Sequence, residues 1–254
     1  MSLTRIVLKY SLFIWVFIIS SCEDTQSTKN KNTQFTNDPS KKVKTESGLN
    51  ESLTTDTVNP QIEQSASSKD TLSKITNDNL IEFMTAYGAE NPETLVEVST
   101  RLGSFKIKLY QKTPIHRANF IYLVNEGYFD ETFFYRVAKN FVIQGGNSDR
   151  NQMALKRFEI GDYTVPQEQV KGLKHTRGAV ALSKRWVDNP SNRSTPYEFF
   201  VVVAKNGAHH LDGEHTIFGK VVEGMDVVDK ISNVPVDQSE WPKKNIFIKA
   251  KVIQ

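Results

Sequence analysis

Residues 133–147 read FFYRVAKNFVIQGGN, which places Arg136 among aromatic side chains and Gln144 eight residues later. The aromatic and β-branched runs at 133–135 and 141–143 fit two short strands on a half-buried sheet surface, and the Gly145-Gly146 pair is expected to end the second. An arginine leaving such a strand presents a fork of N–H donors beside an apolar floor, which can hold a carbonyl or amide. The alternative is an arginine that is solvated or that pairs with a surface carboxylate.

Two later segments, EFFV at 198–201 and HLDGEHTIFG at 210–219, support the first interpretation. In order and spacing the three segments resemble the cyclophilins, whose motifs have the forms F-x-R-x-x-x-x-F-x-x-Q-G-G, Q-F-F and W-L-D-G-x-H-x-x-F-G. The resemblance covers about residues 95–254, and long ordered motifs are far more specific than a single short one. It implies a mainly β fold, an eight-stranded antiparallel barrel capped by two α-helices.

The local patterns agree with a β-rich domain over residues 94–254. Residues 95–99 and 105–109 alternate between apolar and polar side chains, as strands with one buried face do. Thr113 is expected to cap a helix that begins at Pro114 and ends at Gly127. Further strands are expected at 179–182, 199–203, 218–222 and 246–253, with a second helix at 225–231.

A short helical extension is expected at residues 76–93, outside the resemblance. Asn77, Asp78 and Asn79 could cap a helix over 80–87 with an apolar face, and Gly88 would end it. Such a helix either packs on the barrel or binds a partner.

The first 22 residues have the pattern of a bacterial lipoprotein leader. Arg5 and Lys9 precede an apolar run at 10–19, and Ser20-Ser21 lead to Cys22, the only cysteine. The run is shorter than the roughly 20 apolar residues that a membrane-spanning helix needs. We therefore predict a signal peptide over 1–21 and lipidation of Cys22, which would hold the protein on a membrane without crossing it. The predicted location is the bacterial envelope, at the inner or outer membrane and facing the periplasm or the surface.

Residues 22–75 predict a disordered tether. Ser, Thr, Asn, Gln, Lys and Asp dominate this segment, and Phe35 is its only aromatic residue. It cannot bury enough apolar surface to offset its ordering entropy, and its mean span would be about 40 Å. The net charge of +3 comes from mixed signs without a basic block, so nucleic acid is not an expected partner.

Cyclophilins are peptidyl-prolyl cis-trans isomerases, and the resemblance implies that activity without a cofactor. Rotation about a peptide bond faces a barrier of about 18–20 kcal/mol. No bond breaks, so a catalyst must grip the carbonyl, let the proline turn in an apolar pocket and favour the twisted state.

Carried over position by position, the resemblance assigns the catalytic role to Arg136, which would donate to the carbonyl oxygen or the prolyl nitrogen. Gln144 would bond the substrate backbone, and the backbone of Ser183 and Lys184 would lie beside the residues preceding proline. The proline pocket would be lined by Phe141, Val142, Phe200 and Leu211, with His215 at its edge.

Two departures from the family pattern bear on the site. Glu198 stands where the family has glutamine; if it reaches Arg136, it could hold the guanidinium in place or compete with the substrate. His210 stands where many members have tryptophan, which implies weak inhibition by the cyclosporin class. His209, His210 and His215 lie close in sequence, but no full ligand set accompanies them, so no metal site is predicted.

The resulting hypothesis is a monomeric, lipid-anchored isomerase that acts on proline-containing clients and assists folding of envelope or surface proteins. The alternative keeps the fold without catalysis, as a proline-peptide-binding module or holdase. Glu198 and the unusual loop over 184–197 would favour that alternative.

Overall fold

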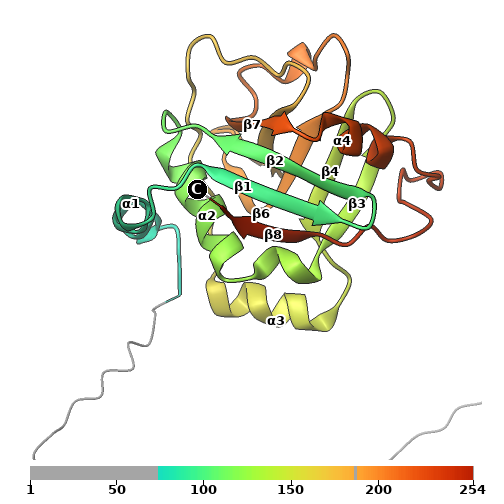
Figure 1. Cartoon of the computed structure of the whole chain (residues 1–254). Coiled ribbons are helices and arrows are strands. Elements are labelled where there is room, and N and C mark those ends of the chain that lie inside the picture. Colours follow the sequence, from blue (N-terminus) through green and yellow to red (C-terminus); the bar gives the residue numbers. More distant parts are fainter. Residues whose placement is uncertain (1–73, 186–187, 254) are drawn as a thin grey trace, which may run out of the picture. The chain divides into compact units, whose positions relative to one another are not determined.

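The computed structural model of the protein describes residues 74–185 and 188–253. Its eight strands form one sheet in the order β3-β4-β6-β5-β7-β2-β1-β8, and every neighbouring pair is antiparallel (Figure 1). The strands are β1 Leu95–Thr100, β2 Gly103–Leu109, β3 Phe133–Ala138, β4 Val142–Asn147, β5 Ala179–Lys184, β6 Ser194–Val202, β7 Ile217–Glu223 and β8 Lys249–Val252. The mainly β antiparallel fold is thereby confirmed.

The two edges of this sheet are joined by the segment that precedes β8. The backbone N–H of Phe134 donates to the carbonyl of Ile246 (3.0 Å), and that of Ile248 donates to the carbonyl of Thr132 (2.9 Å). The strand predicted at 246–253 is therefore shorter than expected, because its first residues bridge to β3 before β8 pairs with β1. The bridge leaves no long unpaired edge on β3, which protects the sheet against pairing with another chain.

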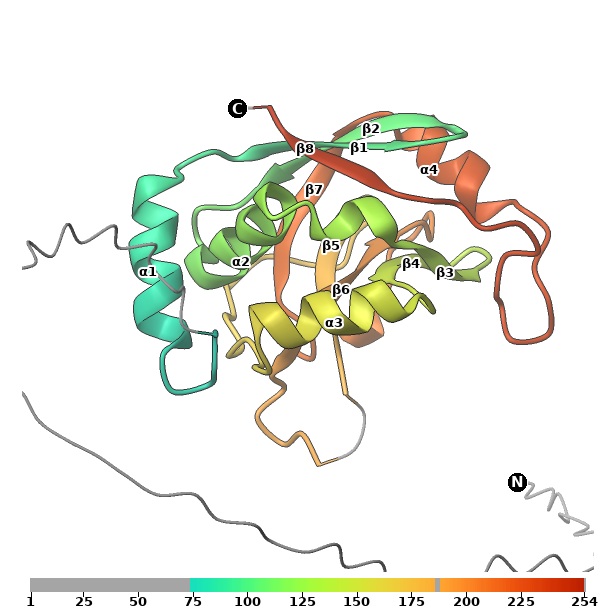
Figure 2. The ribbon, with the colours of Figure 1, turned by 90° about the horizontal axis from the view of Figure 1, so that it is seen from below.

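The two predicted capping helices are present as α2 (Pro114–Asn125) and α4 (Met225–Ser232). They contact opposite parts of the sheet, with α2 against β6, β7 and β8 and α4 against β2, β3 and β4 (Figure 2). Thr113 is the N-cap residue of α2, as predicted, but its side chain does not cap the helix. Its hydroxyl donates to the carbonyl of Tyr110, while the Glu168 carboxylate accepts the N–H groups of Ile115 (3.1 Å) and His116 (2.9 Å). A distant carboxylate thus satisfies the first turn of α2.

The extension forms α1 (Leu80–Glu90), which packs against α2. The rings of Phe83 and Tyr87 meet the ring of Tyr122 edge to face, with centroids 5.3 and 5.2 Å apart. Gly88 does not end the helix as expected. A β-carbon there would lie 3.0 Å from Cβ of Ala118, so the glycine permits close helix packing.

A further helix, α3 (Asn151–Ile160), was not predicted. Only Met153 and Ile160 of this helix are buried, whereas the side chains of Leu155 and Phe158 are exposed. Its sequence therefore lacks a continuous apolar stripe. Helix α3 lies beyond one end of the sheet (Figure 1), next to the short 3-10 helix η1 (Tyr128–Glu131), and the carbonyl of Ile160 accepts the N–H of Ile75 (2.9 Å).

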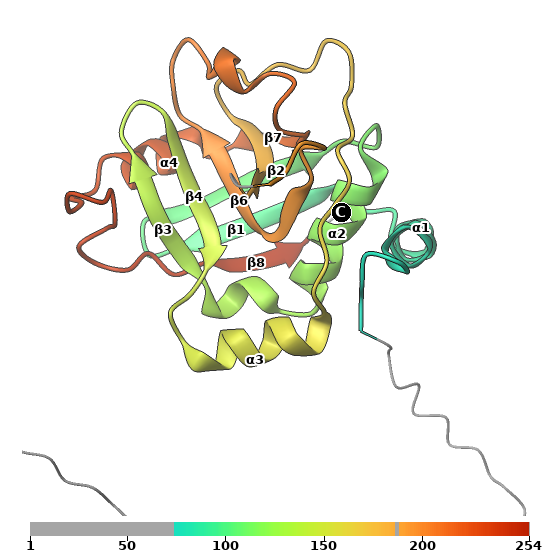
Figure 3. The same cartoon turned by 180° about the vertical axis from the view of Figure 1, so that it is seen from behind.

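The Gly145-Gly146 pair does not end β4, contrary to the prediction. A β-carbon on Gly145 would lie 2.8 Å from Cδ1 of Ile248, and one on Gly146, at φ +94°, would lie 2.2 Å from the carbonyl oxygen of Tyr197. Both glycines are needed because other groups approach the strand closely. Figure 3 shows β3 and β4 side by side at one edge of the sheet.

Strands β4 to β7 bury apolar side chains on both faces. Ile143, Phe199 and Val201 join the main core, whereas the alternating residues Val142 and Phe200 belong to a separate apolar cluster. Because successive side chains of a strand point to opposite faces, this second cluster lies on the outer face of the sheet. It forms the floor of the site described below.

The predicted signal peptide (1–21), Cys22 and the tether as far as residue 73 lie outside the described residues. Lys74 and Ile75, which the tether prediction included, are described, and Ile75 is buried. No helix within 74–185 or 188–253 is long and apolar enough to cross a bilayer.

Candidate active site

All eleven residues predicted for the site line one cavity of about 520 Å³ on the outer face of the sheet. They come from β3, the turn between β3 and β4, β4, β5, β6, the short 3-10 helix η2 (His209–Leu211) and the turn that follows it. The lining residues are Tyr135, Arg136, Phe141, Val142, Gln144, Ser183, Lys184, Glu198, Phe200, His210, Leu211 and His215. Tyr135 is the one lining residue that the sequence analysis did not name.

A β-bulge in β3 explains why Tyr135 and Arg136 both border the cavity. Phe134 pairs with Gly145 and Arg136 pairs with Gln144, so Tyr135 is an extra residue in the register. A bulge of this kind redirects side chains that would otherwise alternate between faces. The Tyr135 hydroxyl and the Arg136 guanidinium thereby meet the same side chain, Gln144, through contacts of 3.5 and 2.6 Å.

The guanidinium of Arg136 is held from two sides. Its Nη1 donates to Oε1 of Gln144 (2.6 Å), and its Nε donates to Oε2 of Glu240 (2.7 Å). Nε2 of Gln144 donates in turn to Oγ of Ser183 (3.2 Å), which links β3, β4 and β5 through side chains. Arg136 therefore pairs with a partly exposed carboxylate, as the alternative expected, and is at the same time anchored at the cavity wall by Gln144.

Aromatic rings form the apolar part of the cavity. The Phe141 ring stacks on His210, with centroids 5.2 Å apart, and its centroid lies 6.0 Å from Cζ of Arg136. Phe200 meets His215 edge to face at 5.2 Å. A cation beside an apolar floor can hold the polar and apolar halves of one peptide unit together.

His215 forms a buried wall of the cavity. Its Nδ1 lies 3.1 Å from the carbonyl oxygen of Leu182, and burial lowers its pKa to about 4. The ring is therefore neutral at neutral pH and adds an uncharged surface to the pocket.

The neighbouring histidines have separate contacts. Nδ1 of His209 lies 3.1 Å from Oδ2 of Asp212, whereas the ring of His210 stacks on Phe141. Among the described residues, no group of three or more His, Cys, Asp or Glu side chains is arranged to hold a metal ion.

Glu198 does not pair with Arg136, so neither effect considered for that pair operates through direct contact. Its carboxylate accepts hydrogen bonds from the Tyr135 hydroxyl and from Nδ2 of Asn147, both at 3.0 Å, and lies 3.8 Å from Nη2 of Arg157. The negative charge at this position is thus matched by an arginine of α3. In this chain, the carboxylate supports the cavity wall and leaves the guanidinium of Arg136 to other partners.

Ser183 and Lys184, which were predicted to lie beside the substrate backbone, form the end of β5 and are held by side-chain contacts. Nζ of Lys184 donates to Oδ1 of Asn192 and to Oε2 of Glu214, both at 2.6 Å. The carbonyl of Ser183 accepts the hydroxyl of Thr195 at 3.0 Å. The side chain of Lys184 is therefore engaged in ion pairing at the rim of the cavity.

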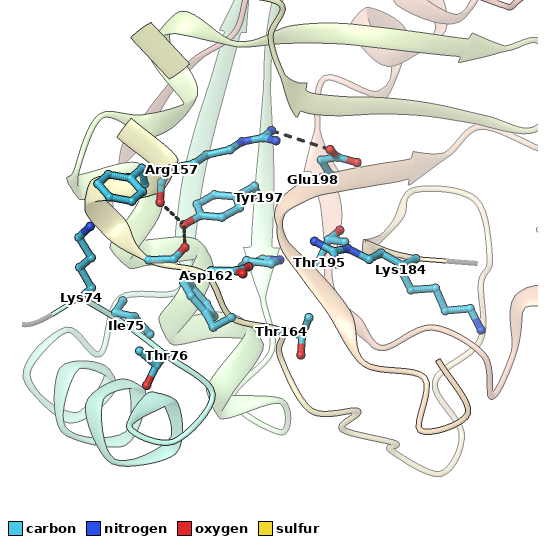
Figure 4. A pocket seen from close by; sticks show the side chains of 15 residues that line it. Lys74, Ile75, Thr76, Arg157, Asp162, Thr164, Lys184, Thr195, Tyr197 and Glu198 are labelled. Carbon is cyan, nitrogen blue, oxygen red and sulfur yellow. Dashed lines mark hydrogen bonds and ion pairs between the residues drawn. The ribbon is translucent and has the colours of Figure 1, made fainter. Parts of the chain in front are cut away.

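A second cavity, of about 600 Å³, adjoins the first and shares Lys184 and Glu198 with it (Figure 4). Its other walls come from residues 74–76, α3, residues 161–164, Arg185 and the first half of β6. Tyr197 also lines it, and its hydroxyl donates to the carbonyl of Gly161 (2.7 Å). The first cavity, not this larger one, holds the arginine–glutamine pair and the aromatic floor.

Three contributors to the site escaped the sequence analysis. Tyr135 precedes Arg136 and would face away from it in a regular strand, so only the bulge reveals its position. Arg157 and Glu240 reach the site from α3 and from the loop after α4. Glu240 is separated from Arg136 by 104 residues, and no local pattern signals such a pairing.

Comparisons with known proteins agree with this geometry. The family model described as cyclophilin type peptidyl-prolyl cis-trans isomerase/CLD matches residues 95–252. A peptidyl-prolyl cis-trans isomerase of Acinetobacter baylyi is 39% identical over 146 residues, which cover 56% of this chain and 73% of that protein. Peptidyl-prolyl cis-trans isomerase B of Escherichia coli is 31% identical over 172 residues, which cover 63% of this chain and 99% of that protein.

Solved structures show the same relationship. The cyclophilin type peptidyl-prolyl cis-trans isomerase of Cryptosporidium parvum superposes with a TM-score of 0.54 at 26% identity, covering 64% of this chain and 98% of that chain. A second structure of that protein, in the presence of the dipeptide Ala-Pro, gives a TM-score of 0.53 at 27% identity, covering 63% and 99%. The family match spans all eight strands, with α1 lying outside it. This chain belongs to the family of cyclophilin-type peptidyl-prolyl cis-trans isomerases.

Proposed function

We propose that this protein accelerates rotation about X-Pro peptide bonds in the cavity bordered by Arg136, and that it does so as a lipid-anchored protein of a bacterial envelope. The observation that carries the catalytic part is the guanidinium of Arg136, which is anchored by Gln144 and Glu240 beside an aromatic floor. Family membership supports the same reaction.

In the proposed mechanism, the proline ring lies on the apolar floor while the guanidinium grips the peptide unit. The floor consists of Phe141, Val142, Phe200 and Leu211. Arg136 donates to the carbonyl oxygen or to the prolyl nitrogen, which regains its lone pair as amide resonance is lost. Because these donors bind the twisted state better than the planar one, they lower the rotational barrier without a covalent step.

The test is a protease-coupled isomerisation assay on a short Ala-Pro-Phe peptide, with wild-type protein and Arg136→Ala. We expect the variant to lose roughly a hundredfold in kcat/KM, because a transition-state donor is removed. Arg136→Lys keeps the charge without the fork and should recover only part of the activity. A folded wild-type protein that binds the peptide without accelerating its isomerisation would contradict the proposal and favour the binding-module alternative.

The envelope location rests on residues 1–22 and is tested separately. When the full-length chain is expressed in a bacterium with a labelled fatty acid, we expect label on the protein and recovery in the membrane fraction. Cys22→Ser should abolish both the fatty-acid label and the recovery in the membrane fraction. Retention of label or of membrane association in Cys22→Ser would contradict the lipoprotein proposal and leave the isomerase proposal intact. Proline-containing envelope or surface proteins are the proposed clients.

A further inference from the structure

We infer that Glu240 is a positioning residue for Arg136, an inference that rests on the proposed function. Oε2 of Glu240 accepts from Nε of Arg136 at 2.7 Å, while Oε1 of Gln144 accepts from Nη1 at 2.6 Å. The two acceptors come from different parts of the chain. Two hydrogen bonds to two nitrogens of a planar guanidinium define the plane as well as the location of that group.

This arrangement leaves part of the donor fork for the cavity. Within the described ranges, no other residue accepts a hydrogen bond from the Arg136 guanidinium, so both N–H groups of Nη2 and one of Nη1 remain uncommitted. Arg136 lines the cavity. Glu240 and Gln144 therefore occupy Nε–H and one N–H of Nη1, and the uncommitted N–H groups of Nη2 and Nη1 are the ones that can meet a peptide carbonyl.

The loop that carries Glu240 is itself firmly built. Oδ1 of Asp237 accepts the backbone N–H groups of Ser239 (2.8 Å) and Trp241 (2.9 Å), and the N–H of Asp237 donates to the carbonyl of Trp241 (2.9 Å). Side-chain to backbone bonds of this type hold a tight turn in one conformation. The carboxylate of Glu240 is thus presented by a closed turn and not by an unrestrained chain.

The same turn is fastened to β3 next to Arg136. The carbonyl of Glu240 accepts the backbone N–H of Val137 (2.8 Å), and the Trp241 ring packs on Phe133 and Tyr135, with centroid distances of 5.4 and 6.1 Å. The attachment points flank Arg136 in the strand. The distance between the two charged groups is therefore set by backbone contacts, as a positioning role requires.

The backbone at Glu240 has φ +63°, a left-handed conformation that glycine or asparagine adopts with less strain. Strained positions of this kind cluster at functional sites. The pair is partly exposed, with 36% of the Arg136 side chain and 41% of the Glu240 side chain accessible, so solvent screens its contribution to stability. The left-handed backbone makes glutamate unfavourable at position 240, and the screened ion pair adds little stability in return. A role in orienting the Arg136 guanidinium explains why a carboxylate is present there.

The experiment compares full-length wild-type protein with Glu240→Gly, Glu240→Gln and the control Asp226→Asn. Glycine suits the left-handed backbone, so Glu240→Gly removes the carboxylate and preserves the turn. Glutamine keeps a neutral acceptor of the same length. Asp226→Asn breaks a different surface ion pair, with Lys230 of α4.

We expect Glu240→Gly to lower kcat by about tenfold, because a misoriented catalytic group loses transition-state contact. KM should stay within about twofold, since the apolar floor still binds the peptide. Glu240→Gln should recover part of kcat, and Asp226→Asn should match wild type. Wild-type kcat in Glu240→Gly, or a kcat above wild type, would overturn the inference.

An NMR measurement of the Arg136 Nε–H group gives a readout that is independent of turnover. We expect this resonance, assigned by its loss in Arg136→Ala, to shift and to exchange faster with water in Glu240→Gly than in wild type. An unchanged resonance would overturn the inference even if kcat fell. If wild-type protein shows no isomerase activity, the proposed function fails while the NMR result still reports on the ion pair, so the two failures are distinguishable.

Discussion

At the scale of single residues, partners decide what a charged side chain does. Arg136 and Glu198 border one cavity, yet they do not pair with each other. Glu240 takes the Nε edge of Arg136, and Arg157 with Tyr135 and Asn147 satisfies Glu198. A glutamine-to-glutamate departure from the family pattern is thereby matched by an arginine of α3. Because these partners hold Glu198, its carboxylate does not compete with the substrate for the guanidinium of Arg136.

His215 gives a prediction about pH. Its folded-state pKa of about 4 lies below its ordinary value of 6.5 because the ring is buried. Between these values the unfolded chain binds more protons than the folded one, so the free energy of unfolding falls as pH is lowered from 7 towards 4. For this residue the loss between pH 7 and pH 5 is about 2 kcal/mol.

Urea unfolding of wild type and His215→Gln at pH 7 and pH 5 measures this effect. We expect the variant to lose less stability over that interval than wild type does. His116 and His175, whose pKa values burial also lowers, remain in both proteins and contribute a common slope. Equal slopes for the two proteins would show that His215 titrates normally in the folded state.

At the scale of elements, α1 is tied to α2 by one buried arginine. The guanidinium of Arg117 donates to the carbonyls of Gly88 (2.7 Å), Asn91 (2.7 Å) and Glu93 (3.2 Å), at and beyond the end of α1. These carbonyls would otherwise lack partners, because the last turn of a helix has no intrahelical donors. The helix outside the family match is therefore joined to the domain by polar contacts as well as by aromatic packing.

We expect Arg117→Ala to lower the free energy of unfolding by about 3 kcal/mol, since hydrogen bonds from a charged donor are lost in a buried place. Equilibrium urea unfolding measures this change. The control is Arg101→Ala, at an exposed turn, whose free energy of unfolding should stay within about 0.5 kcal/mol of wild type. If α1 contributed nothing to the domain, both variants would unfold at the same urea concentration.

Two of the helices could be predicted from their sequences, whereas α3 could not. The limits of α2 could be predicted because Pro114 and Gly127 mark its two ends, and those of α4 because its apolar side chains repeat at helical spacing. Helix α3 could not be predicted, because it buries only two side chains and exposes Leu155 and Phe158. Its role at the site depends on Arg157, whose Nε donates to the Tyr128 hydroxyl at 2.7 Å. That contact exists only once the barrel has formed.

At the scale of the whole molecule, the barrel is closed by the segment before β8. Ile246 and Ile248 are fully buried there, and Cδ1 of Ile248 lies 2.8 Å from where a β-carbon of Gly145 would be. The closing segment thus packs directly over β4, the strand that carries Gln144. Its packing supports the site from behind.

We expect Ile248→Ala to destabilise the protein by about 3 kcal/mol, because a buried aliphatic side chain is replaced by a cavity. Ile253, just after β8, is exposed, so Ile253→Ala is the matched control and should cost much less. Thermal and urea unfolding of both variants would test this. If Ile248→Ala and Ile253→Ala lowered the free energy of unfolding by the same small amount, the segment that closes the barrel would contribute little to stability.

The sequence by itself determined the family, the antiparallel β-rich domain, both capping helices and eleven of the twelve residues that line the cavity, because motif spacing and apolar alternation are carried by neighbouring positions. Only the tertiary structure decided the bulge that turns Tyr135 and Arg136 towards Gln144, the continuation of β4 through its glycines and the partners of Arg136 and Glu198. These features depend on how distant segments approach one another. A carboxylate 104 residues away pairs with Arg136 because a closed turn clamped to β3 brings it there.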